Sequence, residues 1–60
     1  MDKLLYSIPE TCELLNMSRS YLYQLISIGR LRPIKLGRKT LFAAETLRDF
    51  VKKELEKANG

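Results

Sequence analysis

The chain has 60 residues, a net charge of +4 and a single cysteine, and it contains no histidine. A chain this short buries only about 60% of its unfolded surface, so it has no room for a deep pocket. A lone cysteine without histidine argues against an intramolecular disulfide, a metal site and hydrolytic catalysis, so we predict one non-enzymatic domain, residues 1–60, without metal or cofactor.

The first helix is predicted to begin at Ser7, after a loosely held lead-in of residues 1–6. Ser7 and Glu10 form an S-x-x-E capping box, in which each side chain accepts a hydrogen bond from the other residue's backbone. Pro9 falls in the first turn, where its missing N–H does no harm. Asn16 ends this helix, because asparagine tolerates the left-handed conformation found at helix ends.

The second helix is predicted from Arg19 to Ile28. Ser18 is its N-cap, and Gly29 ends it because glycine adopts a positive φ without strain. The buried stripe of this helix consists of Leu22, Leu25 and Ile26. Two short helices separated by a break of three or four residues are typical of the helix-turn-helix motif.

A β-hairpin and a third helix are predicted next. The alternating runs 34–36 and 40–42 flank a turn at Gly37-Arg38-Lys39. From about Ala44 the chain is helical again, with one apolar face. That face consists of Leu47, Phe50, Val51 and Leu55. We expect residues 57–60 to fray, which leaves an ordered core of about residues 6–56.

The predicted fold is mainly α with a small β-hairpin, in the order helix, turn, helix, hairpin and helix. A two-stranded hairpin is marginal alone, so we expect Ile34, Leu36 and Phe42 to pack on the helices. The expected core draws on every element: Ile8, Cys12, Leu15, Met17, Leu22, Leu25, Ile26, Leu31, Ile34, Phe42, Leu47, Phe50 and Val51.

The chain has no sign of a membrane segment or an export signal. No apolar run approaches the roughly 18 residues of a membrane span, and the first residues lack the apolar core of a signal peptide. We therefore expect a soluble protein in the cytoplasm of a bacterial host, with no membrane partner and no small-molecule ligand.

The basic residues are concentrated in one segment of the chain. Six basic residues and no acidic residue fall between Leu14 and Ala44, whereas the remainder holds five basic and seven acidic residues. This segment contains both the second helix and the hairpin. Such segregation is expected of a protein that binds a polyanion, and a solvated basic face without a partner is the alternative.

The second helix has an outward face that is polar and free of carboxylates. An α-helix fits the major groove of B-DNA, and the residues near its N-terminus reach the base edges. Arg19 could pair with guanine and Gln24 with adenine, and both are also compatible with ordinary solvated surface. Tyr21 and Tyr23 could contact phosphate or sugar, and Tyr21 is equally compatible with the edge of the core. The candidate contacts on this face are Arg19, Ser20, Tyr21, Tyr23, Gln24 and Ser27.

The hairpin is a candidate DNA-binding wing. Its tip, Arg38 and Lys39, could straddle the DNA backbone or enter the adjacent minor groove. Lys35 and Thr40 beside the tip would reach phosphates. The alternative is a charged turn that prevents pairing of exposed strand edges. Two further candidates for backbone contact precede the hairpin: Arg30 and Arg32.

Four short motifs follow one another along the chain: Ser18-Arg19-Ser20-Tyr21-Leu22-Tyr23, Gly29-Arg30-Leu31, Lys35-Leu36-Gly37-Arg38-Lys39 and Leu47-Arg48-Asp49-Phe50. In this order and spacing, residues 6–51 resemble the excisionase family of winged helix-turn-helix domains, which is related to MerR-type and AlpA-type regulators. The resemblance implies that the second helix lies in the major groove, that the wing contacts the minor groove or backbone, and that Ser18 joins the contacting residues. Gln24 and Leu41 stand where the family often has basic or polar residues.

The resemblance implies an excisionase, which binds double-stranded DNA at repeated sites beside an attachment site of a phage or another mobile element. Such a protein bends the DNA and helps a tyrosine integrase to excise it, and we expect head-to-tail self-association on the DNA. The alternatives are a small transcriptional regulator and the DNA-binding domain of a DNA-packaging subunit. A further alternative is an interaction module, in which the Leu41 side or the apolar face of the last helix binds another protein.

Overall fold

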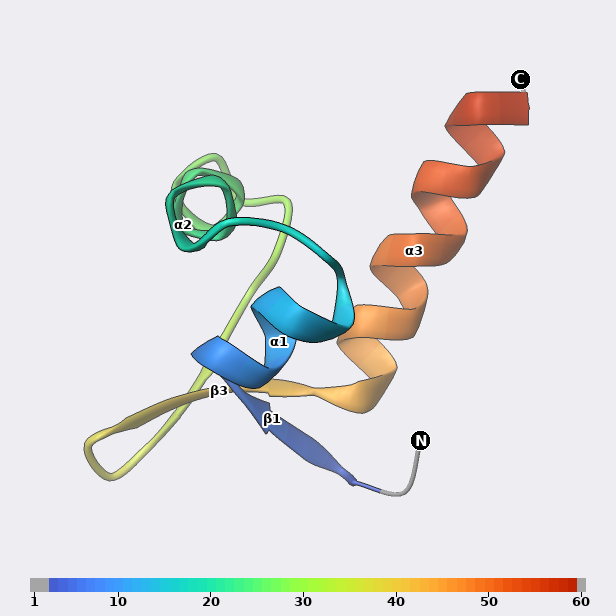
Figure 1. Ribbon diagram of the computed structural model, residues 1–60. Helices are drawn as coiled ribbons and strands as arrows, with labels where there is room; N and C mark the ends of the chain where they lie inside the picture. The colour runs from blue at the N-terminus through green and yellow to red at the C-terminus, as the bar shows by residue number, and fades with distance from the viewer. Residues whose placement is uncertain (1–2, 60) are drawn as a thin grey trace.

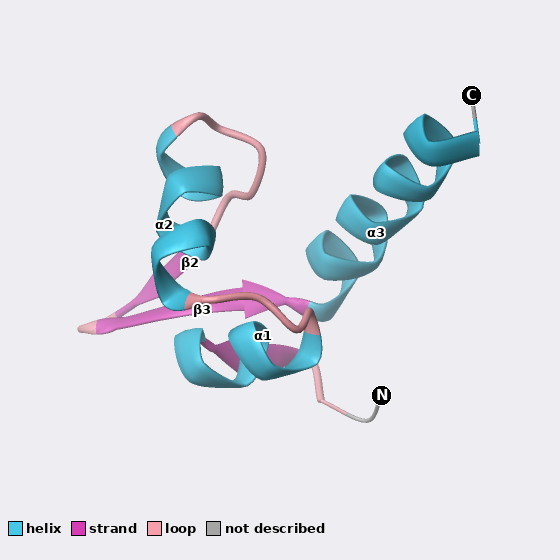
Figure 2. Cartoon of the chain, turned by 45° about the horizontal axis from the view of Figure 1, so that its top comes forward, coloured by secondary structure: helices cyan, strands magenta, loops and turns pink. Residues whose placement is uncertain are grey.

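The computed structural model describes residues 3–59, which form three helices and a three-stranded antiparallel sheet. The elements follow one another as β1 (Leu5–Ser7), α1 (Ile8–Leu14), α2 (Arg19–Ser27), β2 (Ile34–Leu36), β3 (Lys39–Ala43) and α3 (Ala44–Asn59) (Figures 1 and 2). This arrangement confirms the predicted winged helix-turn-helix fold, in which β2 and β3 form the wing.

α1 begins and ends as the sequence predicts. Ser7 N–H donates to Glu10 Oε1 over 2.9 Å and Glu10 N–H donates to Ser7 Oγ over 3.3 Å, so the capping box is complete. Asn16 has a φ of 53°, and the N–H of the next residue, Met17, donates to the Cys12 carbonyl over 2.9 Å. These are the features of a Schellman motif, which satisfies the last carbonyls of a helix.

α2 is bounded by the same kinds of cap. The Tyr21 N–H donates to Ser18 Oγ over 3.1 Å, which confirms Ser18 as the N-cap. Gly29 has a φ of 81°, and Arg30 N–H donates to the Leu25 carbonyl over 2.9 Å, so α2 also ends in a Schellman motif. The regular helix stops one residue before the predicted end, because Ile28 is its C-cap.

The prediction of a loosely held lead-in was wrong for the residues nearest α1. β1 pairs with β3 in antiparallel register, with Tyr6 opposite Phe42, and the strand order β1-β3-β2 puts β3 in the centre of the sheet. A strand of three residues carries almost no alternation of its own, and it pairs with a segment distant in the sequence. Residues 1–2 of the expected lead-in lie outside the described residues.

The turn of the wing is one residue shorter than the predicted turn. Leu36 pairs with Lys39, so Gly37 and Arg38 alone form the turn and Lys39, predicted within it, begins β3. Gly37 has a φ of 63°. A positive φ at the first of two turn residues is typical of type II′ hairpins, whose twist matches that of the flanking strands.

α3 follows β3 without an intervening loop. Ala44 lacks a capping side chain, but its N–H donates to the Leu4 carbonyl over 2.9 Å, so the start of the helix is held by the segment before β1. α3 continues to Asn59, so it includes residues at which we expect fraying, and residue 60 lies outside the described residues. Neither α3 nor any other helix of residues 3–59 has the length and apolarity needed to cross a membrane.

The core joins α1, α2, the sheet and the first turns of α3. Its buried hydrophobic residues are Tyr6, Ile8, Leu22, Leu25, Leu31, Phe42, Ala44 and Leu47, and five expected members pack against them half-buried: Cys12, Leu15, Met17, Ile26 and Phe50. Ile34, Leu36 and Val51 were wrongly placed in the interior, since all three are exposed. The hairpin of β2 and β3 projects from the body, and α3 extends past α1 (Figure 1).

Candidate nucleic-acid interface

α2 presents one buried and one exposed face. Leu22 and Leu25 are 0% and 3% exposed, so they fix the helix on the core. Tyr21, which the sequence left between core and surface, is 47% exposed, and Tyr23 is 51% exposed. Every candidate contact of the helix is on the surface: Ser18, Arg19, Ser20, Tyr21, Tyr23, Gln24 and Ser27.

The N-terminus of α2 is positively charged. Its first turn contains no acidic residue and begins with Arg19, whose charge adds to the positive end of the helix dipole. The Ser18 hydroxyl oxygen is used by the cap, but a hydroxyl also carries one proton that it can donate. Ser18 can therefore hold the helix and donate to a phosphate at the same time.

The wing and α2 face a common cleft. A cleft of about 520 Å³ is lined by Tyr23 from α2, by Lys39, Thr40 and Leu41 from β3, and by Ser7, Ile8, Pro9 and Glu10 at the start of α1. Of the candidate wing residues, Lys35, Arg38 and Lys39 are exposed and Thr40 is half-buried. The structure therefore brings Tyr23, one candidate contact of α2, to the same cleft as Lys39 and Thr40 of the wing, with the start of α1 as a further wall.

One acidic side chain borders this cleft, and it is paired. Glu10 lines the cleft, and its carboxylate accepts a hydrogen bond from Lys3 Nζ. That bond, followed by the backbone bond from Ser7, lowers the pKa of Glu10 from 4.5 to about 2. Glu10 is therefore ionised at neutral pH, and its negative charge beside the cleft is offset by the Lys3 ammonium.

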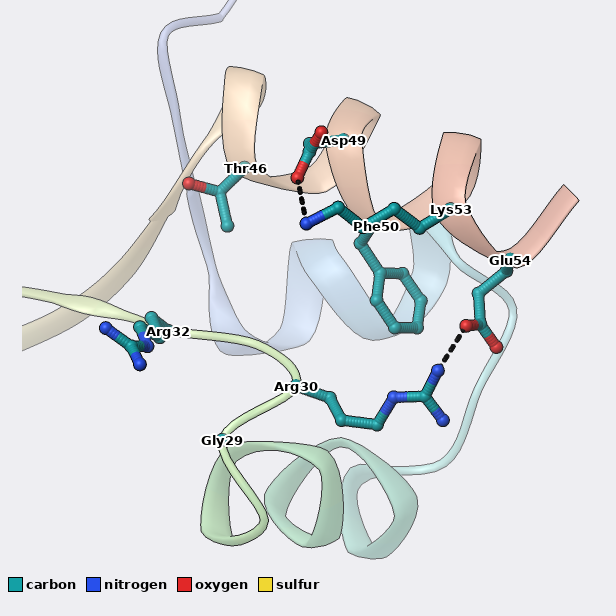
Figure 3. Close-up of a pocket in the computed structure, with 8 residues that line it drawn as sticks. All are labelled: Gly29, Arg30, Arg32, Thr46, Asp49, Phe50, Lys53 and Glu54. Carbon is teal, nitrogen blue, oxygen red and sulfur yellow. Dashed lines mark hydrogen bonds and ion pairs between the residues drawn. The ribbon is translucent and has the colours of Figure 1, made fainter. Parts of the chain in front are cut away.

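The two arginines after α2 have different surroundings (Figure 3). Arg30 Nη2 donates to Glu54 Oε2 of α3 over 2.6 Å, within a cleft of about 420 Å³ between α3 and the end of α2. Arg32 lines the same cleft but points away from Arg30, and it makes no ion pair with another residue in the range 3–59. Sequence reasoning missed the Arg30–Glu54 pair, because the two residues are 24 positions apart and share no local pattern.

The comparisons with known proteins identify the family. A family model described as a helix-turn-helix domain matches residues 5–54, which span every helix and strand up to the last turns of α3. No curated protein and no solved structure matches the chain. The chain therefore belongs to the helix-turn-helix domain family, which contains AlpA-like and excisionase-like DNA-binding domains and is a DNA-binding rather than a catalytic family.

Proposed function

We propose that α2 and the wing together form the DNA-binding surface and that the chain acts as an excisionase. The observation that carries the proposal is the cleft between Tyr23 of α2 and Lys39 and Thr40 of β3, which puts the helix and the wing on one face. A helix in the major groove with a wing beside it uses both elements at once. The basic, acid-free segment from Leu14 to Ala44 supplies the charge of this face.

The proposed roles follow from side-chain chemistry. Arg19 and Gln24 contact base edges, because a guanidinium pairs with guanine and an amide with adenine. Tyrosine and serine hydroxyls and the wing cations hold the phosphates and sugars. These backbone contacts comprise Ser18, Ser20, Tyr21, Tyr23 and Ser27 on the helix and Lys35, Arg38, Lys39 and Thr40 on the wing. Arg32 is a further backbone contact, whereas Arg30 must first exchange Glu54 for a phosphate.

Phosphate binding by the wing is tested by the salt dependence of affinity. The variant Arg38→Gln/Lys39→Gln removes two charges from the wing, and Lys52→Gln/Lys57→Gln removes two from α3. For each contacted phosphate, the slope of log K against log salt changes by about 0.9. On a duplex of random sequence, the wing variant should reduce the slope by about 1.8 and the α3 variant should leave it unchanged. Equal slopes for the two variants would contradict the proposed surface.

The excisionase role has its own test. A single helix and wing cover a small footprint, roughly 600–1,000 Å² of protein surface, so we propose that several copies bind repeated sites head to tail. In a purified assay with a tyrosine integrase encoded beside the chain's gene, adding the protein should stimulate excision and bend the attachment-site DNA. If the protein binds this DNA but never stimulates excision, it would be assigned to the alternative role of a small transcriptional regulator. In either role we propose that it acts in the cytoplasm of a bacterial host.

A further inference from the structure

An open apolar groove lies between the end of α1 and α3. The groove encloses about 390 Å³, and its apolar lining includes Leu14, Leu47, Val51 and Leu55. Leu14 is 45%, Val51 40% and Leu55 58% exposed. Single exposed leucines are common on proteins, but several that line one concave surface form a contiguous patch of the kind found at interaction sites.

The groove continues the packing that holds α3 on the core. Leu47 is 1% exposed, and Val51 and Leu55 follow it on the same stripe of the helix at i+4 and i+8. From Leu47 to Leu55 the stripe spans about 12 Å, at 1.5 Å per residue, and its exposed part from Val51 to Leu55 spans about 6 Å. A helix of two or three turns lying along α3, which is the long helix at the C-terminal end of the chain in Figure 2, would match the full length of the stripe.

The rim of the groove defines the charge of the occupant. Arg48 and Lys52 line the groove beside the apolar stripe, and no acidic side chain of residues 3–59 lines it. Neither cation has an ion-pair partner within the described part of the chain. We propose that this groove binds an acidic amphipathic helix of a partner protein, in which aspartate or glutamate flanks an apolar stripe.

An antiparallel dimer of two α3 helices does not suit the charges of the groove. A symmetric dimer buries the same patch from both subunits. If two α3 helices packed antiparallel by this stripe, the Arg48 and Lys52 side of one would face the same side of the other. The contact would therefore place like charges together.

A lipid surface does not fit either. Membrane-binding segments carry an excess of basic residues. α3 has four basic residues, Arg48, Lys52, Lys53 and Lys57, and four acidic ones, Glu45, Asp49, Glu54 and Glu56, so its net charge is zero. The concave groove, with its two cations, suits a helix better than a flat anionic surface.

The proposed partner site is separate from the DNA-binding surface. In both views α3 lies at the opposite side of the molecule from the wing tip (Figures 1 and 2). DNA on α2 and the wing leaves the groove open. The inference therefore does not depend on whether the protein acts in excision or in transcription.

The test uses two designed helical peptides of about four turns with the same apolar stripe. One carries glutamate on both flanks of the stripe and the other carries lysine. Titrated into the isotopically labelled protein, the glutamate peptide should shift the amide resonances of Leu14, Val51 and Leu55. The lysine peptide should bind roughly tenfold more weakly, because two exposed ion pairs become repulsive contacts.

Three variants sharpen the test. Arg48→Glu/Lys52→Glu should reverse the preference between the two peptides, and Val51→Asp should remove binding of both. Leu4→Asp, a matched control at a side chain that is 85% exposed and lies outside both the groove and the proposed DNA-binding surface, should change neither. Unchanged amide resonances outside the groove show that each variant is folded and that the DNA-binding surface is intact.

Four outcomes would overturn the proposal. The first is that the glutamate peptide does not shift the groove resonances, and the second is that the two peptides bind equally well. The third is a concentration-dependent dimer that shifts the groove resonances without peptide. The fourth is that anionic phospholipid vesicles bind through the groove in preference to the peptide. The third outcome would assign the groove to a second copy of the chain, and the fourth to a membrane.

Discussion

Ser18 is predicted to have two separable roles, as the cap of α2 and as a contact to DNA. α2 has nine residues, too few for a stable isolated helix, so it depends on its packing and on its caps. The Tyr21 N–H would have no partner within the helix, and the Ser18 hydroxyl accepts it over 3.1 Å. Ser18→Ala removes this bond and should destabilise the protein by about 1 kcal/mol.

The matched control is Ser20→Ala, which makes the same chemical change two residues later. Ser20 is exposed within the helix, where alanine is the better helix former by about 0.5 kcal/mol. The two variants should therefore differ by about 1.5 kcal/mol in the free energy of unfolding, with Ser18→Ala the less stable. For a domain of this size, a loss of 1 kcal/mol lowers Tm by about 4–8 °C.

The role in DNA binding is separated by two further variants. Ser18→Asn and Ser18→Asp both supply a capping oxygen, so both should keep the stability of the wild type. Aspartate also places a negative charge at the end of the helix that we propose enters the major groove, so it should weaken DNA binding much more than asparagine does. Urea unfolding and binding to a random duplex measure the two quantities. Equal stability of Ser18→Ala and Ser20→Ala would refute the capping argument, and equal DNA affinity of the asparagine and aspartate variants would refute the placement of Ser18 on DNA.

Three other predictions concern stability. The Thr11 hydroxyl is fully buried with no hydrogen-bond partner among the described residues, so Thr11→Val should match the wild type or exceed it by up to about 1 kcal/mol in urea unfolding, whereas Thr11→Ala should lose stability. Because the folded-state pKa of Glu10 is lowered to about 2, its contribution to the free energy of unfolding should be complete above pH 4.5 and lost as the pH falls toward 2. In an acid titration, Lys3→Met should lose less stability over this pH range than the wild type. Gly37 has a φ of 63° and open space where a Cβ atom would stand, so Gly37→Ala should lose about 1 kcal/mol in urea unfolding from backbone strain alone, and a loss far above this would indicate a steric clash.

Features with a local physical cause were predictable from the sequence. The capping box at Ser7, the left-handed residues Asn16 and Gly29 and the cap at Ser18 each depend on residues within one helical turn. The exposed face of α2 followed in the same way from the spacing of its leucines. The candidate helix contacts other than Tyr21, which the sequence left between core and surface, were therefore placed on the surface correctly before any tertiary contact was known.

Features that depend on distant contacts were not predictable. β1 exists because Tyr6 lies opposite Phe42 in β3, and three residues alone cannot signal a strand. Val51 belongs to the apolar stripe of α3 by periodicity, yet α1 ends too early to cover it. Arg30 and Arg32 have the same side chain, so the sequence gives no reason to distinguish them. Among residues 3–59, Glu54 of α3 forms an ion pair with Arg30 and not with Arg32.

The direct passage from β3 into α3 has a mechanical consequence. Lys39–Ala43 and Ala44–Asn59 are consecutive, so the wing strand and the last helix share one peptide as their joint. Ala44 is 6% exposed and its N–H is bonded to Leu4, so this joint is enclosed by the body. No loop separates the two elements to absorb a change of angle. A wing that tilts as it grips DNA should therefore carry the start of α3 with it, and with it one wall of the apolar groove.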